Sequence, residues 1–131
     1  MSAAPLPEVT PLTEPYWNGL AEGRLLHQRC SVCLHAWLPA REECPRCLAA
    51  NPGWVQSAGT GRLISWVVYR QPLHAYFADR VPYTVAVIEL AEGPRLIGSL
   101  SGDNPAIEAP VRFRPVDVEG FAVASFALVT D

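Results

Sequence analysis

The sequence predicts a mainly β protein, in which a short N-terminal helix and a four-cysteine zinc ribbon precede a five-stranded barrel of OB type. Three observations predict this architecture. All four cysteines lie within eighteen residues, as two C-x2-C pairs. After them, Gly, Pro and Asn separate several segments rich in β-branched and aromatic residues. The sequence shows no second helix of note and no repeat of fixed period, which favours a small closed barrel over a parallel sheet.

Length and composition fit one packed domain with a small attached module. The chain has 131 residues, of which 50% are hydrophobic and 18% charged. We expect a flexible arm over residues 1–12, the helix and ribbon over 13–52, and the barrel over 53–131. The first residues lack the basic start and apolar run of a secretory signal, and no apolar stretch is long enough to span a membrane. We therefore expect a cytoplasmic protein without membrane contact.

A short helix is predicted to begin near Thr13, a residue type that favours the N-cap, and to stop at Gly23. This helix would display Trp17, Leu20 and Ala21 on one side. Two helical turns are too short to be stable alone, so the apolar side must pack on something. The sequence leaves two surfaces open, the chain's own ribbon and a partner protein.

One metal ion is predicted to bind to the four cysteines, which are Cys30, Cys33, Cys44 and Cys47. Two C-x2-C pairs separated by ten residues can deliver four thiolates to a tetrahedral ion, whereas structural disulfides are rare in the cytoplasm. Four thiolates close the coordination shell, so the role of the metal is structural. Zinc is our prediction, although iron also accepts four thiolates. Leu34 and Leu48 follow the pairs, where many such knuckles have glycine.

Five barrel strands are predicted from the β-rich segments, at residues 62–70, 83–90, 95–100, 111–118 and 121–129. In the fourth, Val111 and Phe113 face one way while Arg112 and Arg114 face the other. Pro115 then breaks this alternation, which indicates a barrel edge or a bulge.

The charge of the chain bears on its partners. Thirteen acidic and ten basic residues give a net charge of −3, to which four thiolates around a divalent ion add two negative charges. This negative net charge disfavours binding to the phosphate backbone of a nucleic acid. A ribbon followed by an OB barrel nevertheless occurs in proteins that bind single-stranded nucleic acid, so that function stays an alternative. All ten basic residues are arginines, which excludes a lysine nucleophile.

From Tyr16 onward, the order of the sequence motifs resembles one family. The motifs are W-x-G-L-x-x-G-R-L at 17–25, Q-R-C-x-x-C at 28–33, C-P-x-C at 44–47, G-x-G-x-L at 59–63, the loop at 70–83 and V-A-V-I-E-L-A-E-G-P-R-L at 85–96. This series resembles the rubredoxin-like zinc-ribbon and OB-fold proteins associated with acyl-CoA metabolism, a family long labelled a domain of unknown function. The resemblance covers residues 13–118.

The resemblance implies a non-catalytic accessory subunit with no catalytic residues of its own. Family members are similar to partners of thiolase-superfamily enzymes, including acyl-CoA thiolases and the retro-aldolases that remove steroid side chains. In such complexes the thiolase-like chain performs the chemistry, while the OB chain stabilises it and helps form the acyl-CoA channel. We therefore expect a hetero-oligomer with a thiolase-like or aldolase subunit, and acyl-CoA at the shared site. The sequence agrees, because it has no nucleophile elbow, no cysteine outside the metal motif and no obvious carboxylate pair.

The loop at residues 71–82 is unusually apolar for a connection between strands. Long apolar loops on a rigid barrel usually bind something, so we expect a partner interface with Tyr76 and Phe77 as its anchors. The alternative is a loop that folds back over its own barrel. With the helix included, the expected partner-binding residues are Trp17, Leu73, His74, Tyr76, Phe77, Pro82 and Tyr83.

Two further functions compete with the accessory role. A hydrolase or acyltransferase could use His74 with Asp79, but a His–Asp pair without a nucleophile disfavours this reading. A free-standing acyl-CoA binder could place Arg112 and Arg114 on the nucleotide phosphates. Paired arginines on an outward strand face are, however, often simply solvated.

Overall fold

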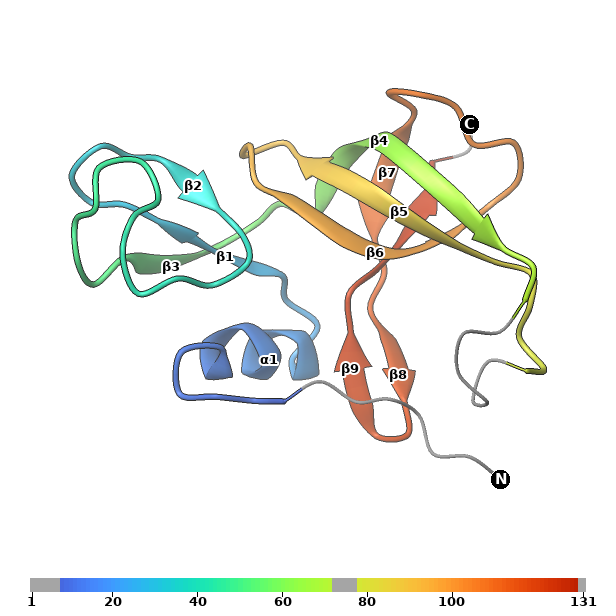
Figure 1. The fold of residues 1–131 in the computed structure, drawn as a ribbon, viewed down its shortest axis with the longest axis horizontal. Helices are drawn as coiled ribbons and strands as arrows, with labels where there is room; N and C mark the ends of the chain where they lie inside the picture. Colours follow the sequence, from blue (N-terminus) through green and yellow to red (C-terminus); the bar gives the residue numbers. More distant parts are fainter. Residues whose placement is uncertain (1–7, 72–77, 130–131) are drawn as a thin grey trace.

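The computed structural model describes residues 8–71 and 78–129. A small ribbon at one end joins a barrel at the other, and a helix and a hairpin lie on the same side of both (Figure 1). In chain order, the elements are α1 (Glu14–Ala21), β1 (Leu26–Arg29), β2 (Ala36–Trp37), β3 (Gly53–Gln56), β4 (Thr60–Tyr69), β5 (Tyr83–Leu90), β6 (Arg95–Ser101), β7 (Pro110–Phe113), β8 (Val116–Val118), β9 (Phe121–Val123) and β10 (Ser125–Leu128).

The ribbon is a three-stranded antiparallel sheet in the order β2-β1-β3. Its central strand pairs Gln28 with Trp37 on one side and with Trp54 on the other. Hydrogen bonding therefore places β3, the strand after Pro52, in the ribbon sheet. The division of the chain at residue 52 stays a prediction.

The predicted five-stranded barrel of OB type is confirmed. Strands close in the order β10-β6-β5-β4-β7, and the pairing of β10 with β6 is parallel while the other pairings are antiparallel. A Cβ at Gly61 would lie 2.5 Å from the carbonyl oxygen of Glu89 on β5, so only glycine fits where β4 enters the barrel.

Two of the predicted strands are not continuous, contrary to our expectation. Segment 111–118 divides into β7 and β8, and segment 121–129 divides into β9 and β10. Pro115 has no backbone N–H to donate, and the last bond before it runs from Arg114 N–H to the carbonyl of Ser125, at 2.7 Å. Beyond that bond, β8 and β9 pair only with each other, as a hairpin that leaves the barrel (Figure 1).

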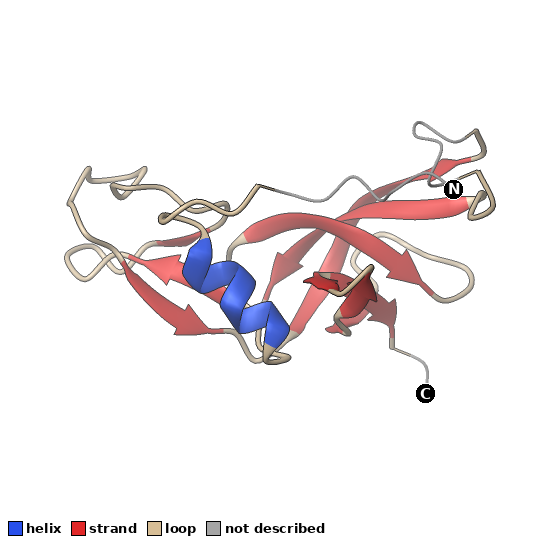
Figure 2. Ribbon diagram, turned by 90° about the horizontal axis from the view of Figure 1, so that it is seen from below, coloured by secondary structure: helices blue, strands red, loops and turns tan. Residues whose placement is uncertain are grey.

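Helix α1 packs on its own chain. Leu20 is 1% exposed and belongs to the same buried cluster as the barrel residues Leu63 and Phe126. The helix, blue in Figure 2, contacts β1 and β9, and the rings of Trp17 and Phe121 meet at 5.1 Å. The sequence left open the ribbon and a partner protein as packing surfaces; the helix does contact β1 of the ribbon, but Leu20 is buried in the barrel cluster, which we did not predict.

Helix α1 begins and ends where predicted, with Thr13 at its N-cap, but the Thr13 side chain does not cap it. Gly23 has a φ of 77°, and the N–H groups of Gly23 and Arg24 bond to the carbonyls of Leu20 and Gly19 at 2.9 and 2.8 Å, which is a Schellman motif. At the other end, the side chain of Thr13 makes no capping hydrogen bond to the helix. Its hydroxyl instead accepts the N–H of Thr10 at 2.9 Å.

One carboxylate fastens the ribbon to the barrel. Glu92 accepts hydrogen bonds from the hydroxyl of Ser57 at 2.7 Å and from the N–H of Ala58 at 2.9 Å. Ser57 also donates its N–H to the carbonyl of Leu25 at 2.8 Å. The linker between β3 and β4 is thereby tied both to the segment before the ribbon and to the β5–β6 turn.

Among the described residues, no helix is long and apolar enough to cross a bilayer.

Candidate metal centre and adjoining surfaces

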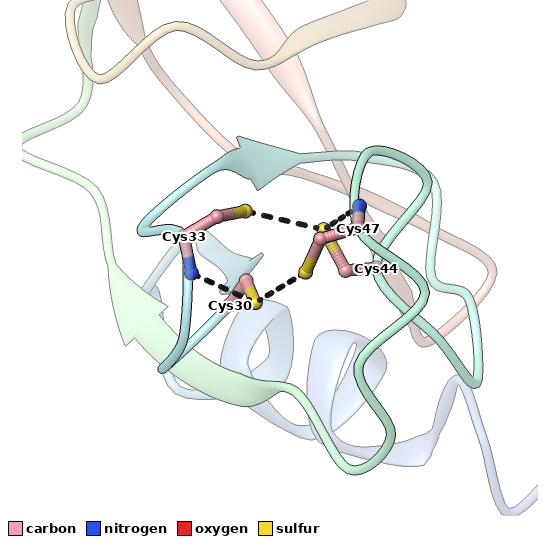
Figure 3. Close-up of side chains that lie close together, drawn as sticks. All are labelled: Cys30, Cys33, Cys44 and Cys47. Atoms are coloured by element: carbon pink, nitrogen blue, oxygen red, sulfur yellow. Dashed lines mark hydrogen bonds between the residues drawn. The ribbon is translucent and has the colours of Figure 1, made fainter.

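The four cysteines converge between two loops of the ribbon (Figure 3). Their sulfur atoms all lie within 4.8 Å of one another, with Cys30 Sγ 3.5 Å from Cys47 Sγ and Cys33 Sγ 3.6 Å from Cys44 Sγ. These separations are far longer than a disulfide bond of about 2.05 Å. Four sulfurs about 2.3 Å from a tetrahedral zinc ion would be about 3.8 Å apart, so the cluster fits one such ion.

The two loops form matching knuckles. In the first, Cys30 Sγ accepts the backbone N–H groups of Val32 and Cys33 at 3.3 and 3.4 Å. In the second, Cys44 Sγ accepts the equivalent pair at 3.3 and 3.4 Å. Backbone donors aimed at sulfur stabilise the thiolate, the form that binds a metal.

The knuckle geometry forms even though leucine stands where glycine is common. Leu34 and Leu48 have φ values of 66° and 65°, in the left-handed region. Their N–H groups close the knuckles by bonding to the carbonyls of Cys30 and Cys44, at 3.0 and 2.9 Å. Leucine at these two positions is therefore compatible with the convergence of the four sulfur atoms.

The thiols of the cluster do not ionise independently. The backbone N–H of Cys33, with further hydrogen bonds, lowers the pKa of Cys30 to about 6. The N–H of Ala49 also acts to lower the pKa of Cys47, but the neighbouring thiol groups raise it to about 12. Four sulfurs this close cannot all carry negative charge without a cation, and a divalent ion supplies that charge.

The buried side-chain amide of Gln28 holds the chain between the two metal-binding loops, a role that we did not predict. Gln28, on β1, is 1% exposed, and its Oε1 accepts the indole N–H of Trp37 at 2.8 Å and the backbone N–H of Arg41 at 2.6 Å. Trp37 packs in the same cluster as the buried Cys30 and Cys44. A glutamine two residues before the first ligand was the available signal.

His27, on β1, lies outside the ligand set and near Glu92. It is 1% exposed, and its Nδ1 has no hydrogen-bond partner in the described part of the chain. Burial lowers the pKa of this imidazole, the carboxylate of Glu92 raises it, and Arg29 lowers it, with a net downward shift. The histidine is therefore neutral at pH 7.

The expected partner-binding residues divide into two groups. Leu73, His74, Tyr76 and Phe77 lie outside the described residues. Trp17 and Tyr83 are partly buried, Pro82 is exposed, and Tyr83 stacks on Tyr69 with the rings 5.2 Å apart.

Trp17 also lines an apolar groove that the sequence did not reveal. The groove has a volume of about 520 Å³ and lies between α1, the ribbon and the barrel strands β5 and β6. Burial raises the pKa of Tyr16 in its wall to about 12. The apolar residues that line the groove include Tyr16, Trp17, Leu38, Val87, Leu96 and Ile97. These residues come from distant parts of the sequence, so no local pattern could have found the groove.

Arg112 and Arg114 are both exposed. Arg112 lines a second groove, of about 400 Å³, together with Arg24 and the linker residues Ser57 and Gly59. Arg114 is not among the residues that line it. The arginine that shares this groove with Arg112 is therefore Arg24, which we did not predict.

Comparisons with known proteins match the chain to two family models. The family model described as the ChsH2 rubredoxin-like zinc ribbon domain matches residues 17–53, and the ChsH2 C-terminal OB-fold domain matches residues 54–115. A DUF35 domain-containing scaffold protein of Methanothermobacter thermautotrophicus is 31% identical over 102 residues, covering 73% of this chain and 76% of the relative. The chain belongs to the ChsH2/DUF35 family. The suspected resemblance is thereby confirmed.

Two further matches differ in the share of the matched protein that this chain covers. A probable enoyl-CoA hydratase alpha subunit of Thermomonospora curvata is 37% identical over 90 residues, which are 69% of this chain and 28% of the relative. This chain thus spans less than a third of that subunit. A solved structure titled Ltp2-ChsH2(DUF35) aldolase superposes with a TM-score of 0.84 at 30% identity, over 94% of this chain and 98% of the other.

The family match and the sulfur geometry together confirm the predicted cofactor site. This ChsH2/DUF35 chain has a rubredoxin-like zinc ribbon whose four cysteines are positioned to bind one metal ion. All its cysteines are in that cluster. A tetrahedral shell of four thiolates would have no open position for a substrate, so the ion would hold the ribbon together.

Proposed function

We propose that this chain is a non-catalytic subunit that stabilises a thiolase-like enzyme acting on acyl-CoA. The observation that carries the proposal is the likeness, over nearly the full length of both chains, to the structure titled Ltp2-ChsH2(DUF35) aldolase. The relatives named DUF35 domain-containing scaffold proteins support the same non-catalytic role. The relatives named as hydratase subunits leave open which enzyme the chain accompanies.

The chemistry of the described residues supports a role without catalysis. The four thiols that could act as nucleophiles all face the metal centre. His27 is buried against the ribbon–barrel junction, and Glu92, the nearby acid, is engaged in fastening the linker. A structural zinc site contributes directly to folding, which suits a protein whose task is to present a rigid surface.

The finer parts of the proposal follow from the family resemblance and the sequence. The partner is an acyl-CoA thiolase or a retro-aldolase, with steroid or lipid side chains as substrates, in the cytoplasm. The loop at 71–82 contacts the partner, and this chain helps form the acyl-CoA channel. Arg112 is the better placed of the two predicted arginines to meet a phosphate, because it shares a groove with Arg24.

Affinity purification of the tagged chain from its native cells tests the role. We expect a thiolase-superfamily chain to co-purify in fixed stoichiometry. The partner produced without this chain should be less soluble and less active, and adding the purified chain should restore it. The pure chain alone should not turn over acyl-CoA thioesters. Recovery of nucleic acid in place of an enzyme, or turnover by the pure chain, would overturn the proposal.

A further inference from the structure

The outer face of the barrel carries an apolar surface that continues the groove beside α1. We define this outer face by four aliphatic residues of β4, β5 and β6, namely Val67, Val85, Val87 and Ile97. We propose that the groove and the outer face together form the surface on which the partner subunit docks. The partner contributes apolar side chains that fill this surface and a carboxylate at its edge. This inference rests on the proposed function and names the surface that function requires.

Strand register brings the four aliphatic residues together. Val67 on β4 lies opposite Val85 on β5, and Val87 lies opposite Ile97 on β6. Ala86, between the two β5 residues, is buried and points into the barrel. The alternation of β5 therefore turns Val85 and Val87 to the outside, beside their cross-strand partners.

The outer face is open to solvent at its two margins. Ile97 is 70% exposed and Val67 is 53% exposed. Outward positions on a barrel strand ordinarily carry polar side chains, and contiguous exposed aliphatic residues mark interaction sites. Two small polar residues also lie at outward positions here, Ser65 opposite Val87 and Ser99 opposite Val85. Charged side chains begin only further along, at the pairing of Arg62 with Glu89 and of Glu89 with Arg95.

The groove joins the outer face through shared residues. Val87 and Ile97 belong to the outer face and also line the groove, where Trp17 and Leu38 form part of the opposite wall. At the far end of the outer face, Tyr83 begins β5 and stacks on Tyr69. The surface thus connects Trp17 with Tyr83, two residues that we expected at the partner interface.

Charges at the rim specify the chemistry of the occupant. Arg95 lines the groove and donates its Nε–H to Glu89 at 2.9 Å, with its side chain 58% exposed. Glu89 also accepts from Arg62, which in turn reaches Glu108. Arg95 is the last residue in this series of ion pairs. Its two terminal amino groups have no partner in the described part of the chain. A carboxylate of the partner would complement the two terminal amino groups of the Arg95 guanidinium.

The extent of the surface favours a protein over a small ligand. A cavity of about 520 Å³ could hold a small apolar molecule. Such a molecule in the groove would, however, leave the outer face around Val67 uncovered. A protein surface can fill the groove and cover the face at once.

The test measures binding of purified partner to variants of the full chain by calorimetry. Ile97→Asp places a charge where the groove and the outer face meet, and we expect it to weaken binding by a factor of about ten or more. Ile107→Asp is the matched control, because Ile107 is 63% exposed but lies in neither the groove nor the outer face, and we expect binding as in the unmodified chain. Arg95→Gln should weaken binding less and reduce its dependence on salt.

The outcomes separate this inference from the proposed function. Zinc content and the thermal transition of each variant establish that it is folded. If the unmodified chain binds no thiolase-superfamily partner, the proposed function fails and this inference falls with it. If the unmodified chain binds its partner and the Ile97 variant binds equally well, only the inference is overturned. Native mass spectrometry that finds an apolar small molecule lost in Ile97→Asp, with the complex intact, would also overturn it.

Discussion

Leu34 and Leu48 occupy equivalent positions in the two metal-binding knuckles, and both have left-handed backbone conformations, with φ values of 66° and 65°. Both side chains are exposed, at 59% and 69%, so burial gives them little in return. A left-handed conformation costs an L-amino acid about 1–2 kcal/mol, a cost that glycine does not have. The ribbon therefore tolerates a local strain because the metal ligands require this turn.

Replacing either leucine by glycine should stabilise the protein. We expect Leu34→Gly and Leu48→Gly each to raise the free energy of unfolding by about 0.5–1 kcal/mol, since relief of strain exceeds the added entropy of the unfolded chain. Urea denaturation of the zinc-loaded protein measures this. Val32→Gly is the control: Val32 is 73% exposed in the first knuckle but lacks a positive φ, so that variant should gain nothing. Destabilisation by all three changes would contradict the strain argument.

The metal centre should contain one zinc ion and no disulfide. Elemental analysis should give one zinc per chain, and mass spectrometry should show four reduced thiols after the metal is removed. Cys44→Ser removes a fully buried ligand and should abolish stoichiometric zinc and unfold the ribbon, because metal-binding free energy at such sites is folding free energy. Iron in place of zinc would correct the identity of the ion. Two disulfides without metal would refute the site.

Gly61 should be intolerant of any side chain. Its Cβ would approach the carbonyl oxygen of Glu89 to 2.5 Å, and that oxygen belongs to backbone in the adjacent strand. We expect Gly61→Ala to lower the free energy of unfolding by about 1–3 kcal/mol. Gly53→Ala is the control, since the nearest atom to a Cβ there is 3.9 Å away. Equal thermal midpoints for the two variants would show that the barrel adjusts at Gly61.

Acidification should destabilise the protein through His27. Burial lowers the pKa of His27 in the folded state below its unfolded value of about 6.5, so the unfolded chain binds more protons between these two values. The free energy of unfolding should therefore fall as the pH drops below about 6.5 and through the folded pKa. His27→Gln, which does not titrate, should flatten this slope. Zinc content at each pH is the control, because acid also releases metal from thiolates.

The loop at 71–82 should contribute to partner binding through its two aromatic anchors. We expect Tyr76→Ala combined with Phe77→Ala to weaken the complex by about 2 kcal/mol or more, roughly thirtyfold in affinity, with zinc content and fold unchanged. Calorimetry against the purified partner measures this. Arg41→Ala, on the ribbon, is the control and should matter less. Unchanged affinity in the double variant would remove the loop from the interface and leave Trp17 and the outer face.

The sequence by itself determined the metal centre and the strand content of the barrel. Thiolates spaced as two C-x2-C pairs meet one ion because each pair occupies a single tight turn, and a turn is a local property of the chain. The alternation of apolar and polar residues likewise marks a strand without reference to its neighbours. Gly23 ended the helix as expected because a left-handed residue is needed at that one position.

Only the tertiary structure decided which segments lie together. The parallel pairing of β10 with β6 joins strands far apart in the chain. The hairpin of β8 and β9 leaves the barrel just beyond the hydrogen bond from Arg114 to Ser125, which also joins distant residues. The burial of Leu20 and the groove beside Trp17 likewise need α1 to meet the barrel. A linear pattern shows which side chains avoid water but not which surfaces cover them, because that choice depends on contacts between distant residues.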